Sequence, residues 1–229
     1  MRTAPLLLCF YTALAGCGEF PRDAENTLKQ VEAGRPLRVG WSVAEPWARR
    51  GPDGGPAGLE PDLVRRWAAT RGVRVDWVEA GEAQIVEGLS DNALDLGLAG
   101  FTDVAPWGAL VGQTQPYISA KAVIGARPGV RAPDDWAGVP ISYDPRRPGL
   151  AALIRAQKAV PDLNAPDFRA AYEPELAGLG LVPTGTTLAT ERHAIATPPS
   201  ENALTFALDR FLHRHRDAIE RRLGQEARR

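Results

Sequence analysis

The chain has 229 residues, of which 44% are hydrophobic, and a formal net charge of −1 at pH 7. This length and composition are those of a globular protein with one large domain or two small lobes. The near-zero charge argues against a nucleic-acid-binding protein.

The N-terminal residues have the pattern of a lipoprotein signal peptide. One cation, Arg2, precedes an apolar stretch of about ten residues, whereas a membrane-spanning helix needs roughly twenty. The stretch ends at Leu14-Ala15-Gly16-Cys17, where small residues before a cysteine suit cleavage by a signal peptidase. We predict that residues 1–16 are a removed signal peptide. Cys17 would carry a thioether-linked lipid and a further acyl chain such as palmitate, which together anchor a protein stably. The alternative is a chance cysteine in an ordinary secretory signal.

The two cysteines of the sequence limit its chemistry. Cys9 lies in the segment that would be removed, and Cys17 would be alkylated. Disulfides and thiolate metal sites are then excluded in the mature chain, which fits an oxidising compartment outside the cytoplasm. Residues 17–34 are predicted to form a lipidated tether that ends in a short helix at 27–33.

Strands and helices alternate from Leu37 onward. Strand patterns at 37–41, 73–77 and 94–100 are separated by helices that begin near Pro61 and Ala83. Such a strand-helix-strand series predicts a parallel sheet. The Gly/Pro-rich segment 46–58 is predicted to be a loop without regular structure.

A second unit is predicted after Tyr117. Its strands are expected at 122–126, 139–143 and 167–172, with a helix at 149–158. Residues 192–197 are expected to be extended. A final helix is predicted with Ser200 as its N-cap and an apolar stripe formed by Leu204, Leu208, Phe211 and Leu212.

Five short segments carry a family resemblance. They are LRVG at 37–40, EPW at 45–47, GLEPDL at 58–63, DLGLAGFT at 95–102 and PY at 116–117. Their order and spacing resemble the family 3 solute-binding proteins of ABC importers. The resemblance covers roughly residues 27–126 and, more loosely, 193–197 with the C-terminal helix.

The resemblance implies an α/β fold of the two-lobe type 2 periplasmic-binding kind. Each lobe would be a small, mostly parallel sheet flanked by helices, and two crossing strands would form the hinge. Lobe one would span 35–118 and lobe two 119–196, and residues 197–229 would form C-terminal helices that return to lobe one. A solute would bind in the cleft between the lobes, where loops after parallel strands converge.

The implied function is that of a lipid-anchored periplasmic solute-binding component, which would deliver its solute to an ABC permease of the inner membrane. The resemblance implies no catalysis, no cofactor and no metal, and a monomeric protein. Two alternatives stay open. One is an accessory or sensor protein that uses the fold without transport, and the other is an enzyme similar to cyclohexadienyl dehydratase, with Glu173 as its acid.

The sequence departs from family members that bind amino acids. In those members an arginine after a Thr-containing turn binds the α-carboxylate of the ligand. Trp107 stands at that place when the chain is aligned backwards from Pro116-Tyr117. An indole offers one N–H and no charge, and the turn Thr102-Asp103 adds a negative charge. The predicted ligand is therefore not a standard α-amino acid.

The carboxylate that lobe two contributes in the family is matched loosely by Glu173. Several tryptophans together with Asp103 and Glu173 would form an aromatic and acidic cleft suited to an organic cation. Purely structural roles, such as packing of Trp107 near the hinge and turn capping by Asp103, are the alternative. The predicted ligand-binding residues are Trp41, Trp47, Thr102, Asp103, Trp107, Tyr143 and Glu173.

Overall fold

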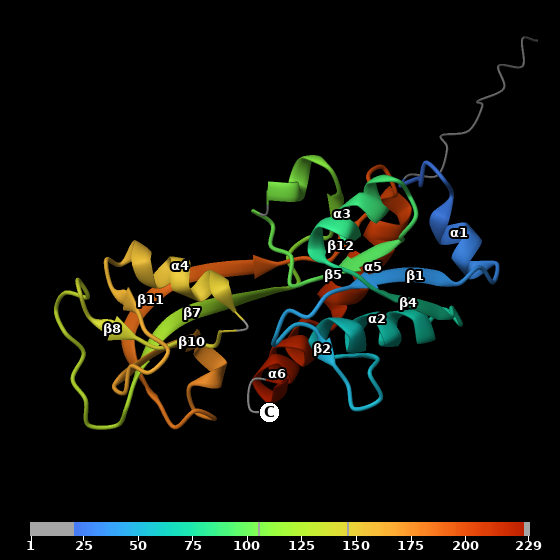
Figure 1. Ribbon diagram of the computed structural model, residues 1–229. Helices are drawn as coiled ribbons and strands as arrows, with labels where there is room; N and C mark the ends of the chain where they lie inside the picture. The colour runs from blue at the N-terminus through green and yellow to red at the C-terminus, as the bar shows by residue number, and fades with distance from the viewer. Residues whose placement is uncertain (1–20, 105, 146, 227–229) are drawn as a thin grey trace, which may run out of the picture.

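A computed structural model describes residues 21–104, 106–145 and 147–226. The chain forms two α/β lobes, each built around its own sheet, and two long strands run from one lobe into the other (Figure 1). The predicted two-lobe fold is confirmed. The predicted lobe boundaries at 118/119 and 196/197 stay predictions.

The sheet of the first lobe has five strands in the order β4-β1-β5-β12-β6. Its centre is parallel, as predicted: β1 (Leu37–Trp41) pairs with β4 (Val75–Glu79) and with β5 (Leu96–Leu98). Two short strands, β12 (Ala196–Thr197) and β6 (Gly112–Gln113), extend the sheet in antiparallel fashion. The late part of the chain therefore completes the lobe that the early part begins.

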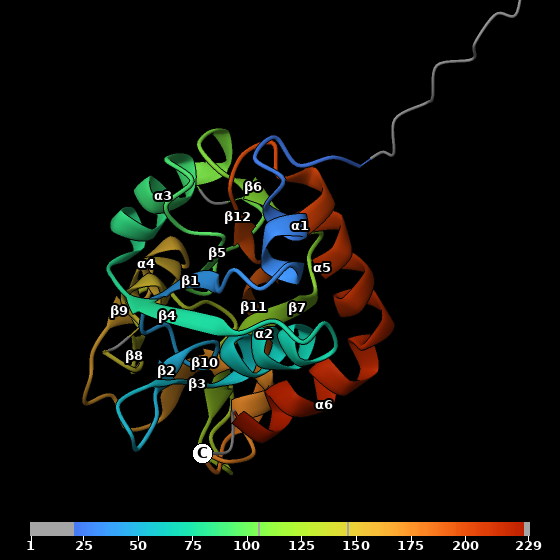
Figure 2. The same ribbon diagram turned by 90° about the vertical axis from the view of Figure 1, so that its right-hand side faces the viewer.

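Helices cover both faces of this sheet (Figure 2). On one face, α2 (Leu59–Ala69) and α5 (Asn202–Arg214) bury Leu63, Trp67 and Leu208 in the main core. On the other face, α3 (Glu82–Ser90) buries Ile85 and Leu89 in a second, smaller cluster. The remaining helices of this lobe are α1 (Thr27–Glu32) and α6 (Arg216–Glu226). No helix in the described part of the chain is both long and apolar enough to cross a bilayer.

The sheet of the second lobe differs from the mostly parallel one predicted. Its order is β10-β7-β11, and β7 (Ile118–Ala126) pairs antiparallel with both β10 (Phe168–Tyr172) and β11 (Val182–His193). A parallel pair, β8 (Pro140–Ile141) with β9 (Val160–Pro161), lies beside α4 (Pro148–Ala156). Because β7 leaves the first lobe and β11 returns to it, these two strands connect the lobes (Figure 1).

Two local predictions need correction. The loop at 46–58 contains a two-stranded hairpin, β2 (Arg49–Arg50) with β3 (Pro56–Ala57). Ser200 is not the N-cap of α5, because its φ is +67° and Glu201 occupies the cap position. Only the end of β11 falls in the segment 192–197 that is predicted to be extended, and α6 lies within the C-terminal helices predicted for 197–229.

Candidate functional site

Three aromatic rings pack together where the two lobes meet. Trp47 comes from the loop after β1, Tyr172 ends β10, and His193 ends the connecting strand β11. The ring centroids of Trp47 and His193 are 3.6 Å apart at an interplanar angle of 33°, and Tyr172 meets Trp47 edge-on at 5.7 Å. All three side chains are buried. Residues from lobe one, lobe two and a connecting strand are thus in direct contact.

Gly100 allows Trp47 to reach this position. Its φ is +64°, and a Cβ on it would lie 2.5 Å from Cδ1 of Trp47. Glycine adopts this left-handed conformation without the steric cost that other residues have. The carbonyl of Gly100 also lies 3.1 Å from Nδ1 of His193, so this turn positions both stacked rings.

Glu191 places a negative charge beside the rings. Its Oε2 accepts a hydrogen bond from the Tyr172 hydroxyl at 2.5 Å and lies 3.4 Å from Nε2 of His193. Burial raises the pKa of Glu191, but the contacts with His193 and Tyr172 outweigh it and lower the pKa below its ordinary value. Glu191 is therefore ionised at neutral pH.

An ion pair closes the other side of Tyr172. The Arg147 guanidinium lies 2.6 Å from Oε2 of Glu175 and 5.4 Å from the centre of the Tyr172 ring. Burial lowers the pKa of Arg147, and the hydrogen bond and charge of Glu175 raise it to a net increase. Glu175 also accepts the backbone N–H of Tyr172 at 2.9 Å. We call the residues of this region the interlobe cluster: Trp47, Arg147, Tyr172, Glu175, Glu191 and His193.

The buried acidic residue Glu60 supports the cluster through the segments next to it. Glu60 accepts hydrogen bonds from the Tyr117 hydroxyl at 2.8 Å and from the Gly100 N–H at 3.3 Å. Its own N–H donates to the carbonyl of Trp47 at 3.0 Å. Burial raises the pKa of Glu60 to about 7, although the two hydrogen bonds oppose the increase. Glu60 thus fixes the Trp47 loop through its backbone, and it fixes the Gly100 turn and the residue before β7 through its side chain.

Of the predicted site residues, Trp47 lies in the interlobe cluster and Thr102 adjoins it. Thr102 forms a β-bridge with His193. Trp41 is buried in the core at the end of β1, and Tyr143 is half-buried against the same core.

The other predicted residues are not part of the cluster, although Asp103 adjoins it through Arg192. The Trp107 indole donates to Oε1 of Glu82 at 2.6 Å and packs on the second core cluster. Asp103 forms an ion pair with Arg192 at 2.6 Å. Glu173 is exposed, so the acidic groups near the rings are Glu175 and Glu191. Cys17 lies outside the described residues.

Several residues of the interlobe cluster are not among the predicted site residues. Glu191 and His193 carry the usable signal, since residues two apart on a strand point to one face. Tyr172 adjoins the predicted Glu173. Nothing in the sequence indicated that Arg147 would pair with Glu175, which comes from a different element.

Comparison with known proteins identifies the family. Residues 37–220 match the model of the bacterial extracellular solute-binding proteins, family 3. The chain belongs to this family. No curated protein matches this family 3 chain in sequence.

Solved structures confirm the fold of this family 3 protein. An ancestral cationic amino acid solute binding protein has a TM-score of 0.69 at 18% identity, over 89% of this chain and 100% of that one. A putative ABC transporter binding component from Wolinella succinogenes, complexed with lysine, gives 0.63 at 18%, over 82% and 94%. A polar amino acid ABC uptake transporter substrate binding protein from Streptococcus thermophilus gives 0.66 at 15%, over 86% of both chains.

Proposed function

We propose that this protein is the lipid-anchored, extracytoplasmic solute-binding component of an ABC-type importer. It binds a small polar or cationic organic solute between its lobes, and that solute is not a standard α-amino acid. Family membership supports solute binding, and two of the structural relatives are named as parts of ABC transporters. We propose binding without catalysis, since Glu173, the acid of the dehydratase-like alternative, is exposed and is not part of the interlobe cluster.

The observation that carries this proposal is the set of groups around the His193 ring. The indole face of Trp47, the edge of Tyr172 and the carboxylate of Glu191 surround an imidazole. The same groups suit an organic cation, since an ammonium over an aromatic face gains about 0.5–2 kcal/mol. A hydrogen bond to a charged carboxylate adds about 1.5–3 kcal/mol. A cationic solute that took the place of the His193 ring against Trp47 would gain both the ring-face attraction and the hydrogen bond to Glu191.

The charges nearby argue against an α-amino acid. One arginine belongs to the interlobe cluster and another adjoins it, and both are paired: Arg147 with Glu175 and Arg192 with Asp103. An α-carboxylate would have to displace one of these acids. Trp107, which stands in the family's arginine position, already donates its N–H to Glu82.

Calorimetry and thermal-shift measurements test the proposal. Choline-like amines should raise the melting temperature of the wild-type protein, since a ligand at a hundred times its Kd adds about 2.7 kcal/mol. Glu191→Gln should weaken amine binding about tenfold or more, because it removes the anion and keeps the shape. Glu173→Gln is the matched control and should bind like wild type. Binding of lysine, arginine or neutral amino acids in preference to the amines would contradict the proposal.

The lipid anchor is tested separately. In a bacterial host, the wild-type chain should incorporate labelled palmitate and sediment with membranes, because Cys17 follows Leu14-Ala15-Gly16. Cys17→Ser should do neither. Palmitate incorporation that persists in Cys17→Ser would refute the anchor without affecting the solute proposal.

One observation favours a second candidate function, that of a non-transporting accessory or sensor protein. The rings of the two lobes pack directly on each other, so part of the expected solute site is occupied by His193. Deletion of the gene distinguishes the two functions. Loss of uptake of the amine that binds in vitro supports the importer, and unchanged uptake supports the accessory protein.

A further inference from the structure

We propose that the groove between α1 and α5 is a membrane-docking surface that binds the headgroups of anionic phospholipids. This inference rests on the lipid anchor at Cys17 proposed above. It concerns a face of lobe one that shares no residue with the interlobe cluster.

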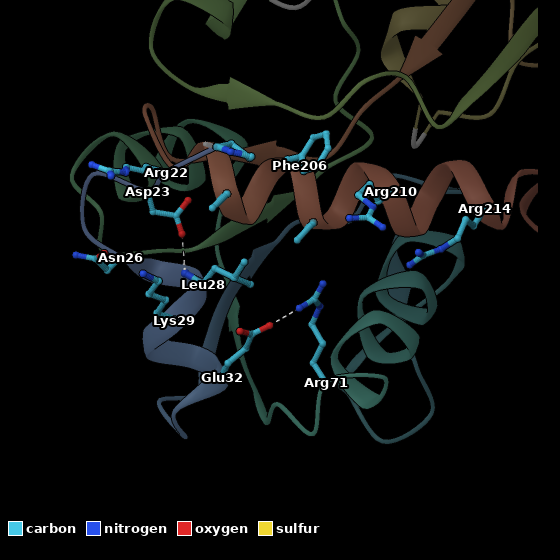
Figure 3. A pocket seen from close by; sticks show the side chains of 13 residues that line it. Arg22, Asp23, Asn26, Leu28, Lys29, Glu32, Arg71, Phe206, Arg210 and Arg214 are labelled. Carbon is cyan, nitrogen blue, oxygen red and sulfur yellow. Dashed lines mark hydrogen bonds and ion pairs between the residues drawn. The ribbon is translucent and has the colours of Figure 1, made fainter. Parts of the chain in front are cut away.

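The groove is a cavity of about 810 Å³ with a cationic lining (Figure 3). Five of its lining residues are basic and two are acidic. The basic residues come from both walls and from the end of α2, so they surround the opening instead of following one helix. They are Arg22, Lys29, Arg71, Arg210 and Arg214.

Much of this positive charge is not neutralised inside the protein. Arg71 pairs with Glu32, whereas Lys29, Arg210 and Arg214 have no ion-pair partner among residues 21–104, 106–145 and 147–226. Positions 206, 210 and 214 recur at helical spacing on α5, so they share one face of that helix. Three unpaired cations beside one opening fit a surface with many phosphates.

An exposed aromatic ring lies among these cations. Phe206 is 49% exposed, and the Arg210 guanidinium lies 5.9 Å from the centre of its ring. Phe206 also lines a neighbouring cavity of about 890 Å³. An apolar ring beside cations is the combination that interfacial surfaces use, because the ring enters the headgroup region while the cations contact phosphates.

The N-terminal segment is fixed to this groove. Oδ1 of Asp23 accepts the N–H of Leu204 at 2.9 Å, and Oδ2 accepts the N–H of Leu28 at 2.8 Å. In return, Glu201 accepts the N–H groups of Glu25 at 2.8 Å and Thr27 at 3.2 Å. Asp23 therefore caps both α1 and α5, and Glu201 caps the segment that leads into α1.

This attachment keeps the groove close to the bilayer. Pro21 lines the groove, and four residues of extended chain from Cys17 span at most about 14 Å. Electrostatic attraction acts over a Debye length of about 10 Å. An anionic leaflet attracts each nearby Lys or Arg appreciably, so the short tether brings these cations into its field. The tether holds the bilayer near these cations, whereas it does not hold a free solute or another protein near them.

Vesicle binding without any acyl chain tests the inference. The mature chain from residue 17 with Cys17→Ser is mixed with vesicles of phosphatidylcholine containing phosphatidylglycerol, or of phosphatidylcholine alone. We expect co-sedimentation with the anionic vesicles only, and its loss at high salt. Arg210→Gln with Arg214→Gln should reduce the partition coefficient at least about tenfold.

The matched control removes the same charge elsewhere. Arg127→Gln with Arg131→Gln changes two exposed arginines of lobe two and should leave partitioning within about twofold, because the sheet of lobe two lies far from α1 (Figure 1). Unfolding curves check that both double variants are folded.

Equal binding to both vesicle types, or equal losses in both double variants, would overturn the proposal. Wild-type vesicle binding too weak to detect, together with lower solute uptake by the Arg210/Arg214 variant in cells, would overturn it in favour of a protein partner. Because this assay contains no lipidated protein, failure of the anchor at Cys17 is read independently from palmitate labelling.

Discussion

Asp23 should be one of the most destabilising positions to truncate outside the core. Its carboxylate caps α5 through Leu204 and the first turn of α1 through Leu28. Replacing a capping residue by alanine costs about 0.5–2 kcal/mol, typically about 1. Since two caps are lost together, Asp23→Ala should lower the free energy of unfolding by about 2 kcal/mol.

Urea unfolding followed by tryptophan fluorescence measures this effect. In thermal unfolding, the melting temperature of a protein of this size should fall by about 4–8 °C, since a change of 1 kcal/mol in the free energy of unfolding corresponds to about 2–4 °C. The slope of the urea transition should not change, because the same surface is exposed on unfolding. Asp23→Asn should show an intermediate loss, since the amide keeps one of the two acceptor oxygens.

Glu25→Ala is the control for Asp23→Ala. Glu25 is exposed, and its contribution to the capping comes from its backbone N–H, which alanine retains. Its stability should stay within about 0.5 kcal/mol of wild type. An Asp23→Ala protein as stable as Glu25→Ala would refute the capping argument, and with it the rigid attachment of the tether.

Three further predictions concern the support of the interlobe cluster. Because burial raises the pKa of Glu60 from 4.5 to about 7, folding favours its protonated form. As the pH rises from 4.5 to 7, the free energy of unfolding of the wild type should therefore fall by about 3 kcal/mol. Glu60→Gln should not show this decrease, and urea unfolding across this pH range measures both proteins. Gly100→Ala should destabilise more than Gly72→Ala, since both have a φ of +64° but only the Cβ at position 100 meets Trp47; equal losses would contradict this. Tyr172→Phe should lower stability by about 1 kcal/mol through loss of the bond to Glu191, and an unchanged urea midpoint would refute that bond's contribution.

The first lobe could be predicted closely from sequence because its signals are local. The strand at Leu37–Trp41 has the predicted bounds, and the parallel pairing follows from alternating strands and helices. The second lobe offered weaker signals. The strand Val182–His193 is mostly exposed or half-buried, contains Pro183 and Gly185, and pairs with a strand about sixty residues earlier. Neither its burial pattern nor its partner can be read from neighbouring residues.

The candidate site was predicted only in part because its geometry depends on contacts between elements. Glu173 and Glu175 are equally plausible as carboxylates in sequence. The turn at Glu173–Glu175 directs the second one back to the N–H of Tyr172 and leaves the first in solvent. The residue spacing from Tyr117 predicts that Trp107 lies at the ligand site, but in the structure its indole N–H donates to Glu82 of α3. Such pairings become visible only when the elements are packed.

The position of the interlobe cluster is set by the core beneath it. Glu60 makes no ring contact, yet it holds the carbonyl of Trp47, the N–H of Gly100 and the hydroxyl of Tyr117. Gly100 in turn contacts His193 through its carbonyl. Loss of the Glu60 carboxyl group should therefore alter solute affinity through the Gly100 turn, which positions the rings of Trp47 and His193, although Glu60 touches no solute. Glu60→Gln preserves the size of the side chain and should retain binding. Glu60→Ala leaves the buried Tyr117 hydroxyl without its acceptor, at about 1–3 kcal/mol, and should lose both stability and affinity. Loss of stability in Glu60→Ala with unchanged amine affinity would show that the rings are positioned independently of this carboxylate.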